Sequence, residues 1–380
     1  MKIGFDVSQT GTSRAGCGYF ADSLIRALAV EAKHEQFLLY PTFGNFFFDA
    51  NWEQATYAPQ RRNFARGLSH SDFDELSVFW SDPPADFEEQ LGTPDVVHSN
   101  NFYCPRQFQQ SRLVYTLYDL SFLQNPDWTT ETNRRGCFEG VFQASLHADH
   151  ILAISQFSKR HFLETFPHYP EERITVVPLG SRFSHARRIS QPNRLLGLTS
   201  DQFWLCVGTL EPRKNHDRLL HAYAKLKARL GHTLPLVLAG GKGWLLDHLN
   251  RLIGELGLTG DVIMVGYVDD SSLQWLYENC HAALYPSLFE GFGLPPLEAM
   301  KCGAPVIVGN KTSLPEVVGD AALAVDPFDV DAIAGAIRKL VNDTSLRREL
   351  SVKGLQRANE FNWRETATKT LAVYKEVASV

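Results

Sequence analysis

The stretch FWLCVGTLEPRKNHDRLLHAYAKLKARL, residues 203–230, carries the pattern that decides the fold. Its first five residues are an uninterrupted apolar run, which is typical of a parallel strand buried on both faces. A polar loop with a glycine follows, and apolar residues then recur at helical spacing at Leu219, Tyr223, Leu226 and Leu230. A buried strand, a loop and an amphipathic helix in this order make up the repeating unit of a parallel α/β sheet.

The same unit recurs along the whole chain. Apolar runs with little polar alternation predict strands in both halves, at residues 3–7, 37–40, 95–98, 113–117, 151–154, 174–177, 203–207, 236–239, 262–265, 282–285, 305–308 and 323–325. Because helical patterns lie between many of these runs, the sheets should be parallel with right-handed crossovers. We therefore expect an α/β protein with two doubly wound, Rossmann-like domains that face each other across a cleft.

Length and composition bound the class of protein. A chain of 380 residues favours two or three domains at about 150 residues each, and 44% hydrophobic with 21% charged residues indicates an ordinary folded chain. The net charge of −6 argues against an extended nucleic-acid surface. The six cysteines are scattered without a C-x-x-C pair, which predicts reduced thiols and neither a zinc site nor a disulfide framework.

The chain shows no targeting or membrane-spanning signal. No apolar run reaches the roughly 18 residues that a transmembrane helix needs, and residues 1–6 are typical of a strand, not of a signal peptide. A cytoplasmic protein is the expectation.

A polar and basic stretch divides the two halves. Residues 181–199 have little apolar periodicity, so we predict a first domain over residues 1–182, a linker over 183–199 and a second domain over 200–363. The alternative is a long surface loop within one domain. The irregular, aromatic segment 45–73 is either an excursion toward an acceptor or ordinary core packing.

Ligands of such sheets bind outside the carboxyl ends of the strands, and the strongest signal there is EGFGLPPLE, residues 290–298. Gly291 and Gly293 permit backbone conformations that are closed to other residues, and two prolines suit the first turn of a helix. A helix N-terminus attracts anions, and carboxylates can accept hydrogen bonds from a sugar diol or ribose. Taken alone, Glu298 is explained as a complement to the helix dipole and Glu290 as a solvated residue. The complete nine-residue pattern favours a site over that interpretation.

The second signal is GTLEPRKN, residues 208–215. Arg213 and Lys214 would lie at a strand's carboxyl end beside a helix start, where they can neutralise a diphosphate. Asn215 is the expected N-cap of the following helix. A lone Arg-Lys pair is usually surface charge, but its place in the first loop of the second domain favours a site.

The first domain gives weaker signals. Gly16 and Gly18 lie in a glycine-containing loop after the first strand, which is either a phosphate loop or a simple strand-to-helix turn. Four polar residues lie at or just beyond strand ends, and each either lines the cleft or serves as a cap or packed polar group: Asp6, His98, Asp119 and Ser155. The D-x-D spacings at residues 72–74 and 329–331 fall in a loop and beside a helix start, so we expect no metal site.

Together these motifs resemble the retaining, nucleotide-sugar-dependent glycosyltransferases of family 4, which have the GT-B fold. The resemblance covers nearly the whole chain. Residues 290–298 look like the E-x7-E motif of the family, and residues 208–215 look like its G-x-x-x-x-R-K-N segment. Further similar segments are VVPLG at 176–180, SLPEVVG at 313–319 followed by Asp326-Pro327, and FNW at 361–363. The resemblance implies that the C-terminal helix, about residues 364–380, packs back on the first domain.

The resemblance also implies roles for single residues. Arg213 and Lys214 would bind the donor diphosphate, and Glu290 would contact the donor sugar, so these three and Asp119 are the implied catalytic residues. Tyr118 stands where the family often has a histidine before the aspartate, which puts an imidazole role in doubt. The remaining implied donor contacts are Gly16, Gly18, Gly208, Val268, Gly291, Phe292, Gly293, Leu294 and Glu298. The implied acceptor-side residues are Asp6, His98, Tyr118 and Ser155.

The implied reaction moves a sugar from a nucleoside diphosphate to an acceptor hydroxyl with retention and without a metal or other cofactor. Likeness to bacterial polysaccharide mannosyltransferases favours GDP-mannose, while UDP- and dTDP-sugars stay open. The acceptor is a glycan, either free or lipid-linked, and basic residues such as Arg61 and Arg62 would either meet anionic headgroups of a membrane or form a solvated face. The rival classes are a GT-B-shaped nucleotide-sugar epimerase and a non-catalytic nucleotide-binding module.

Overall fold

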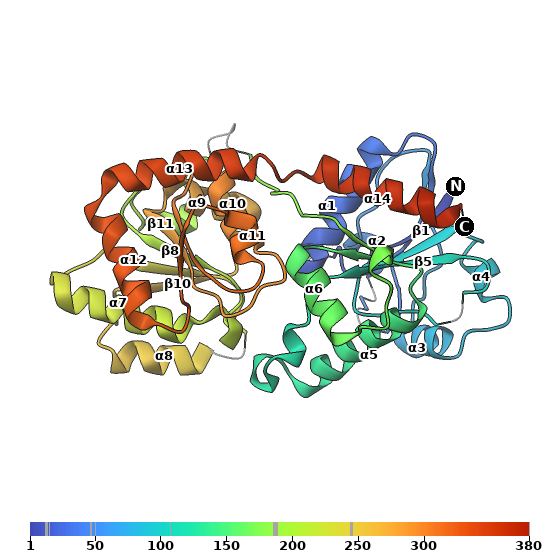
Figure 1. The fold of residues 1–380 in the computed structure, drawn as a ribbon, viewed down its shortest axis with the longest axis horizontal. Helices are drawn as coiled ribbons and strands as arrows, with labels where there is room; N and C mark the ends of the chain where they lie inside the picture. The colour runs from blue at the N-terminus through green and yellow to red at the C-terminus, as the bar shows by residue number, and fades with distance from the viewer. Residues whose placement is uncertain are drawn as a thin grey trace. The chain divides into compact units, whose positions relative to one another are not determined.

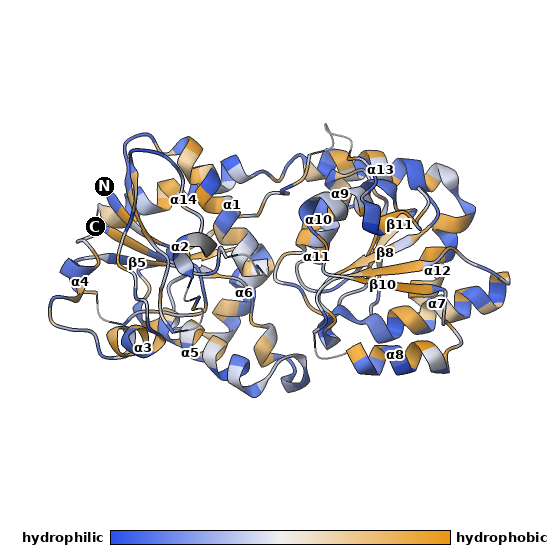
Figure 2. Cartoon of the chain, turned by 180° about the vertical axis from the view of Figure 1, so that it is seen from behind, coloured by the Kyte–Doolittle hydropathy of each residue, from blue (hydrophilic) through white to orange (hydrophobic). Residues whose placement is uncertain are grey.

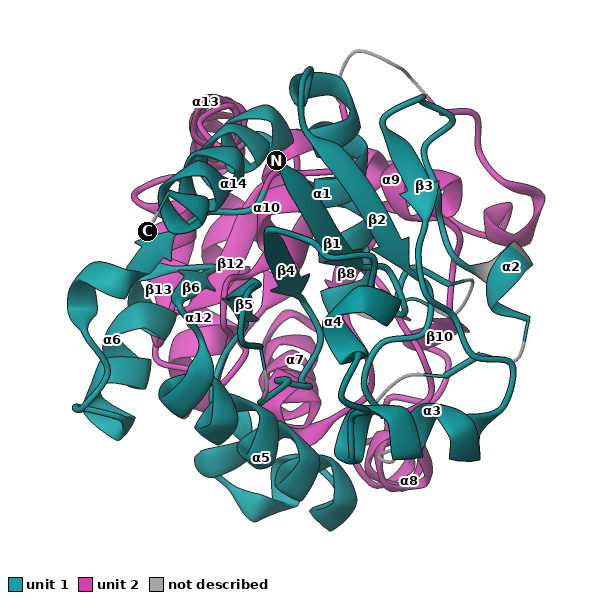
Figure 3. Ribbon diagram, turned by 90° about the vertical axis from the view of Figure 1, so that its right-hand side faces the viewer, with its two compact units in different colours: residues 1–179, 362–380 teal, residues 180–361 magenta. Residues whose placement is uncertain are grey.

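The computed structural model describes residues 1–379 except 12, 13, 15, 46, 47, 50, 107, 185–188, 244 and 245. The chain forms two compact units (Figure 3): unit 1 comprises residues 1–179 and 362–380, and unit 2 comprises residues 180–361. Each unit has its own parallel sheet. No helix in the part of the chain that the structure describes combines the length and the apolar character needed to cross a bilayer.

Unit 1 has, over its described residues, a seven-stranded parallel sheet in the order β3-β2-β1-β4-β5-β6-β7, of which Figure 3 labels β1 to β6. The strands are β1 (Lys2–Asp6), β2 (Gln36–Tyr40), β3 (Phe64–Arg66), β4 (Val96–Ser99), β5 (Arg112–Leu117), β6 (His150–Ala153) and β7 (Ile174–Val176). The helices are α1 (Gly16–Glu31), α2 (Trp52–Ala55), α3 (Phe73–Ser81), α4 (Phe87–Gln90), α5 (Glu131–His147), α6 (Gln156–Thr165) and α14 (Trp363–Ala378).

Unit 2 has a six-stranded parallel sheet in the order β10-β9-β8-β11-β12-β13, again counted over the described residues. The strands are β8 (Trp204–Val207), β9 (Leu236–Ala239), β10 (Val262–Gly266), β11 (Ala282–Tyr285), β12 (Val306–Gly309) and β13 (Leu323–Val325). The helices are α7 (His216–Leu230), α8 (Leu246–Glu255), α9 (Asp270–Asn279), α10 (Leu294–Lys301), α11 (Leu314–Val318), α12 (Val330–Asn342) and α13 (Thr344–Ala358).

Helices cover both faces of the unit 2 sheet, which explains why its strands are continuous apolar runs. Trp204 and Cys206 of β8 join the core cluster that contains α7 and α12. Phe203, just before β8, stacks on Trp275 of α9 with ring centroids 6.1 Å apart. Figure 2 shows the strands β8 and β10 in hydrophobic colours between helices of mixed character. Full burial of each apolar side chain contributes about 1.5–3 kcal/mol, so both helix layers stabilise the sheet.

The twelve predicted strands are confirmed, and β3 was missed. β3 has only three residues, and Ala65 and Arg66 are exposed, so its sequence has no apolar run that could reveal it. It pairs with β2 at the edge of the sheet, where one side of a strand needs no partner. β3 and α2 both fall in the aromatic segment 45–73, of which residues 46, 47 and 50 lie outside the described residues.

The C-terminal helix α14 belongs to unit 1 and lies beside α1 (Figure 1). Trp363 packs edge-on against Phe20 of α1, and Thr366 Oγ1 donates to the Pro178 carbonyl at 2.6 Å. Farther along, the Tyr374 hydroxyl lies 2.6 Å from His98 Nδ1 in β4. The last helix therefore supplies core contacts to a sheet whose strands end about 190 residues earlier.

Most of the stretch that we predicted to be a linker, residues 183–199, lies in unit 2, with 185–188 outside the described residues. Leu195 and Leu198 are buried, and Gln191 Nε2 donates to the carbonyls of both at 2.7 and 2.8 Å. A stretch with two buried leucines packs as part of a domain even though it lacks helical or strand periodicity.

Candidate functional site

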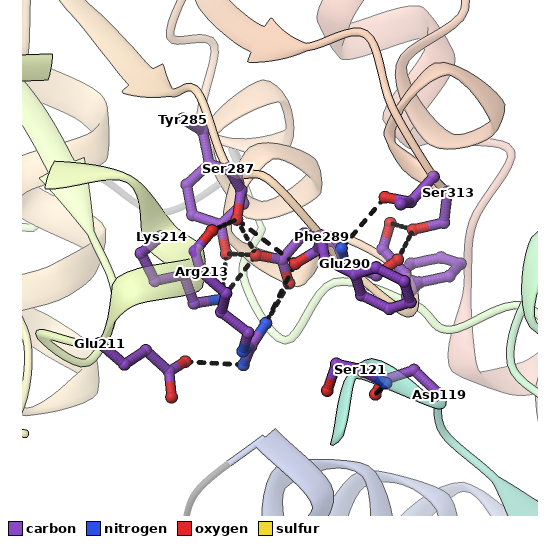
Figure 4. Close-up of polar contacts among 12 residues, drawn as sticks. Asp119, Ser121, Glu211, Arg213, Lys214, Tyr285, Ser287, Phe289, Glu290 and Ser313 are labelled. Atoms are coloured by element: carbon purple, nitrogen blue, oxygen red, sulfur yellow. Dashed lines mark hydrogen bonds and ion pairs between the residues drawn. The ribbon is translucent and has the colours of Figure 1, made fainter. Parts of the chain in front are cut away.

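Glu290 stands at the centre of a buried polar cluster in unit 2. Its loop follows β11, while its two cationic partners lie on the 3₁₀ turn η5 (Pro212–Lys214) after β8. Lys214 Nζ is 2.7 Å from Glu290 Oε1, and Arg213 Nη1 is 3.1 Å from Oε2. Because β8 and β11 are paired neighbours in the sheet, their loops emerge side by side (Figure 4). The structure thus brings Arg213, Lys214 and Glu290, all singled out in the sequence, into direct contact.

Two hydroxyl groups complete the shell around the carboxylate. Tyr285, the last residue of β11, donates from its hydroxyl to Glu290 Oε1 at 2.9 Å, and Ser287 Oγ donates to the same oxygen at 2.5 Å. The Tyr285 hydroxyl also accepts a hydrogen bond from Lys214 Nζ at 2.6 Å. Burial alone would raise the pKa of Glu290, but the charges of Lys214 and Arg213 outweigh it and lower the pKa to about 2. Glu290 is therefore a fixed anion at neutral pH.

Arg213 bridges two carboxylates. Besides Glu290, its guanidinium contacts Glu211 through Nη2 at 2.7 Å (Figure 4). A guanidinium has five donors in a rigid planar fork, so two carboxylates can fix its orientation while it keeps the geometry that suits a phosphate. The arrangement therefore orients two cations, the partly exposed Arg213 guanidinium and the buried Lys214 ammonium.

The loop before α10 is held in shape by the segment that precedes α11. Ser313 Oγ donates to the carbonyls of Glu290 and Phe292, both at 2.8 Å, and the Glu290 amide donates to Thr312 Oγ1 at 3.0 Å. Gly293 is the N-cap of α10 with φ 112°, and a Cβ there would lie 2.8 Å from the Leu314 side chain. Glycine is therefore required at this position both for its conformation and for its size.

Leu294 begins α10, and prolines occupy its first turn as predicted. Glu298, on the next turn, is buried and paired with Arg182: Arg182 Nε lies 2.8 Å from Oε1. A second nitrogen of Arg182 contacts Asp270 at 2.9 Å. Burial raises the pKa of Glu298, against the lowering effect of Arg182. The structure thus gives this carboxylate a protein partner that the sequence did not reveal, because Arg182 lies at the edge of the predicted linker.

Asn215 occupies the N-cap position of α7 but does not cap it with its side chain. Its backbone is left-handed, with φ 64° and ψ 35°, and its Nδ2 donates to the carbonyls of Pro286 at 2.9 Å and Pro327 at 2.7 Å. The predicted position is right and the predicted contact is wrong. The amide instead ties the Arg213-Lys214 turn to the loops after β11 and β13.

The other predicted donor-side residues of unit 2 lie at strand ends. Gly208 follows β8 with φ 151°, and a Cβ there would approach the Lys214 side chain at 3.5 Å. Val268 is buried just after β10. Gly291 and Phe292 lie in the Glu290 loop, and Phe292 is buried.

In unit 1, the two glycines of the predicted phosphate loop differ in whether the structure has room for a side chain at their positions. Both Gly16 and Gly18 lie in the first turn of α1. A Cβ on Gly18 would meet the Gln9 carbonyl oxygen at 2.3 Å, whereas a Cβ on Gly16 would meet nothing within 4 Å among the described residues. Close packing of the helix on the preceding loop explains Gly18, whereas the residues that the structure describes place no steric constraint on Gly16.

His98 and Ser155 have structural partners within unit 1. His98 is fully buried, with Nδ1 at 2.6 Å from the Tyr374 hydroxyl and Nε2 at 2.8 Å from Thr116 Oγ1. Burial lowers its pKa to about 3. Ser155 is the N-cap of α6 and accepts a hydrogen bond from the Ser158 amide at 2.9 Å. These contacts favour packing and capping over an acceptor role for both residues.

Asp6, Tyr118 and Asp119 lie at the carboxyl edge of the unit 1 sheet. Asp6 accepts two hydrogen bonds from Ser8 on Oδ1, while Oδ2 is buried without a partner among the described residues. Burial raises the pKa of Asp6 to about 7, against those hydrogen bonds. The Tyr118 hydroxyl donates to the Asn100 carbonyl at 2.5 Å. Asp119 is partly exposed and accepts the Ser121 amide at 2.8 Å (Figure 4).

The two D-x-D spacings form helix caps. Asp72 accepts the amides of residues 74 and 75 at the start of α3, and Asp329 accepts those of residues 331 and 332 at the start of α12.

Family models match both halves of the chain. "Glycosyltransferase Family 4" matches residues 15–181, and "Glycosyl transferases group 1" matches residues 191–357. In an alignment 394 residues long, gaps included, the chain is 37% identical to O-antigen chain mannosyltransferase B of Escherichia coli. The alignment covers 99% of this chain and all of that protein. The chain belongs to glycosyltransferase family 4.

Two further comparisons bear on this family 4 glycosyltransferase. It is 32% identical over 315 residues to the serotype-specific mannosyltransferase WbdA of Escherichia coli, covering 75% of this chain and 38% of that protein. The crystal structure of HepE from Anabaena in complex with UDP-glucose matches with a TM-score of 0.72 and 19% identity, covering all of both chains. The predicted GT-B fold is confirmed by such neighbours.

The buried polar cluster around Glu290 in unit 2 includes residues that the sequence did not single out. In the sequence, Tyr285 is the end of an apolar strand, Ser287 is a loop residue and Glu211 is a surface charge. In the structure, Tyr285 and Ser287 donate hydrogen bonds to Glu290, and Glu211 pairs with Arg213. The only available signal was position, since each lies within a few residues of a strand's carboxyl end.

Proposed function

We propose that this glycosyltransferase transfers mannose from GDP-mannose to a hydroxyl of a saccharide acceptor, with retention and without a metal, in the assembly of a polysaccharide. The observation that carries the proposal is the meeting of Arg213 and Lys214 on Glu290 at the paired ends of β8 and β11. Full-length similarity to a protein named as an O-antigen mannosyltransferase supports the choice of sugar and of pathway.

The chemistry follows from where charge develops. Breaking the anomeric C–O bond leaves negative charge on the diphosphate, and preorganised cations at that place lower the barrier. Glu290 and Glu211 hold the Arg213 guanidinium in one orientation, and Tyr285 and Glu290 hold the Lys214 ammonium. We propose that these two cations bind the diphosphate and stabilise the leaving group.

The contacts of Glu290 favour retention by front-face attack over double displacement. A carboxylate nucleophile must be able to reach the anomeric carbon, but both oxygens of Glu290 accept bonds from charged or hydroxyl donors. Its lowered pKa also marks a weakly basic anion. We propose that Glu290 orients Lys214 and Arg213, and that the departing phosphate accepts the proton of the acceptor hydroxyl.

Loss of one cation should lower turnover strongly. A single preorganised donor is typically worth about 3 kcal/mol in the transition state, so Lys214→Ala or Arg213→Ala should reduce kcat by roughly two to three orders of magnitude. The matched control is Lys225→Ala, which removes an exposed lysine of α7 that pairs with Asp331. Turnover within a few-fold of the unchanged protein in Lys214→Ala would contradict the assigned role.

The donor and stereochemistry are tested in one assay series. Purified protein is incubated with GDP-mannose, UDP-glucose or a dTDP-sugar, with and without a mannose oligosaccharide and with and without EDTA, and the products are analysed by NMR. With the acceptor present, we expect an α-linked product when GDP-mannose is the donor and none with the other donors. EDTA should not change the amount of product. An inverted anomeric centre refutes retention, conversion of the donor to an isomeric nucleotide sugar without acceptor indicates an epimerase, and nucleotide binding without any turnover indicates a binding module.

The acceptor is tested with free and lipid-linked versions of the same oligosaccharide. Higher kcat/KM for the lipid-linked form, together with sedimentation of the protein with anionic vesicles, would favour an acceptor held at a membrane surface. Equal kcat/KM for both forms would favour recognition of the saccharide alone.

A further inference from the structure

A pocket of about 600 Å³ opens in unit 1, and its lining shares no residue with the cluster around Glu290. Its lining comes from two elements: Leu123 ends the 3₁₀ turn η1 (Ser121–Leu123) after β5, and Glu131, Arg134, Arg135 and Phe138 lie on the first turns of α5. Sites for small organic molecules usually measure about 300–1,000 Å³, so the size is sufficient for a ligand.

One wall of the pocket is polar and carries both signs of charge. Arg134 donates to Glu131 from two nitrogens, Nε to Oε2 at 2.8 Å and Nη2 to Oε1 at 2.9 Å. Arg135 Nε lies 4.0 Å from the same carboxylate, and its side chain is 80% exposed. The paired Glu131 and Arg134 are thus held in place, and the wall offers hydrogen-bond donors and acceptors side by side.

The other wall is apolar and unusually exposed. Phe138 is 40% exposed and Leu123 is 37% exposed. The Phe138 ring stacks on Phe142, with centroids 5.8 Å apart and planes within 10°, and this contact fixes its orientation. A fixed, exposed aromatic ring beside charged groups gives a surface on which a flat apolar face can rest.

The combined lining selects a class of ligand. A hydrocarbon chain would desolvate three charged side chains without offering any of them a hydrogen bond, and a phosphate would face the Glu131 carboxylate. A sugar has hydroxyls that both donate and accept, together with a C–H face that packs on an aromatic ring. We propose that this pocket binds a sugar unit of the acceptor chain other than the unit that receives the transferred sugar.

The place of the pocket in unit 1 fits this assignment, which rests on the proposed function. Leu123 lies four residues after Asp119, and Asp119 stands at the carboxyl end of β5, the edge where the first domain is expected to present the acceptor. The same short segment would therefore serve the reacting end of the acceptor and a more distant sugar.

Binding tests the pocket without reference to turnover. Isothermal titration of the full chain with a mannose tetrasaccharide should give saturable binding, and Phe138→Ala should weaken it about tenfold, since an aromatic contact contributes up to about 1.5 kcal/mol. Arg135→Ala should also weaken it. The controls are Leu146→Ala, an exposed apolar residue of α5 outside the pocket, and Arg160→Ala, an exposed residue of α6. Both controls should bind as the unchanged protein does.

Kinetics then separate the pocket from the proposed function. Phe138→Ala should raise KM for a tetrasaccharide acceptor with kcat unchanged, and should leave KM for a monosaccharide acceptor as it was. If the unchanged protein binds the tetrasaccharide through Phe138 but transfers no sugar, the proposed function fails and the pocket stands. If it transfers sugar while both pocket variants bind and react like the controls, or if inorganic phosphate displaces the tetrasaccharide, the pocket assignment is overturned.

Discussion

Glu290 shows how much of the unit 2 site depends on one ionised side chain. The carboxylate accepts bonds from two cations and two hydroxyls, and it is nearly inaccessible to solvent. Removing one member of a buried ion pair is far more damaging than its net contribution suggests, because the partner charge stays buried. The same contacts that orient Lys214 therefore also stabilise the fold of unit 2.

The pKa of Glu290 gives a pH prediction. Its value falls from an ordinary 4.5 to about 2 in the folded chain, so ionisation stabilises the fold above about pH 4.5, and this stabilisation is lost as the pH falls toward 2. The shift corresponds to about 3 kcal/mol at neutral pH. Glu290→Gln should lower the free energy of unfolding by about this amount at pH 7, and the difference should shrink below pH 4. Urea unfolding followed by tryptophan fluorescence measures both values.

The matched control for this prediction is Glu349→Gln, which removes an exposed carboxylate that pairs with Lys353. Exposed pairs of this kind contribute roughly 0–1 kcal/mol. A difference between Glu290→Gln and the unchanged protein that stays constant from pH 7 to pH 3 would show that Glu290 is not held as an anion by its neighbours.

At the scale of elements, the turn between β8 and α7 depends on Asn215. Replacing it tests two separate contributions, a left-handed backbone and two hydrogen bonds to the carbonyls of Pro286 and Pro327. Asn215→Gly keeps the backbone conformation and loses only the hydrogen bonds, whereas Asn215→Ala loses both. We expect the alanine variant to be less stable than the glycine variant by about 1–2 kcal/mol, the cost of placing a Cβ in this conformation. Thermal unfolding of the two variants measures the difference.

Activity extends the test of this turn. Both variants should lower kcat more than they raise the KM of the donor if Asn215 places Arg213 and Lys214 for the transition state. Equal stability of the glycine and alanine variants would argue that the turn relaxes, and unchanged kcat in both would refute a positioning role for Asn215.

The same elements show what the sequence could predict. Strands covered by helices on both faces are continuous apolar runs, so β8, β9 and β11 were predictable, whereas the short, half-exposed β3 was not. Charged residues at strand ends pointed to Arg213, Lys214 and Glu290. Tyr285 and Arg182 were missed because Tyr285 contacts Lys214 and Arg182 contacts Glu298, both far away in the chain. A single sequence does not encode such pairs in its local pattern.

At the scale of the whole molecule, the chain returns to unit 1 after completing unit 2. Residues 362–380 supply α14, which packs on α1 and gives His98 a buried partner in Tyr374. Unit 2 is continuous over residues 180–361, and among the described residues no later segment joins its core cluster. The two units should therefore differ in their ability to fold when they are separated.

We predict that a fragment of residues 180–361 folds alone, whereas residues 1–179 do not. Without α14, the apolar side of α1 and the His98 ring lose their cover, and burial of each large apolar side chain contributes about 1.5–3 kcal/mol, a large share of the stability of a single domain. Joining residues 362–380 to residue 179 through a flexible linker should restore folding of unit 1. The same joined fragment with Tyr374→Phe should be less stable by about 1–3 kcal/mol, because the buried His98 nitrogen loses its hydrogen-bond partner. Circular dichroism and thermal unfolding of the four fragments measure these outcomes. Cooperative unfolding of residues 1–179 alone would show that α14 is dispensable.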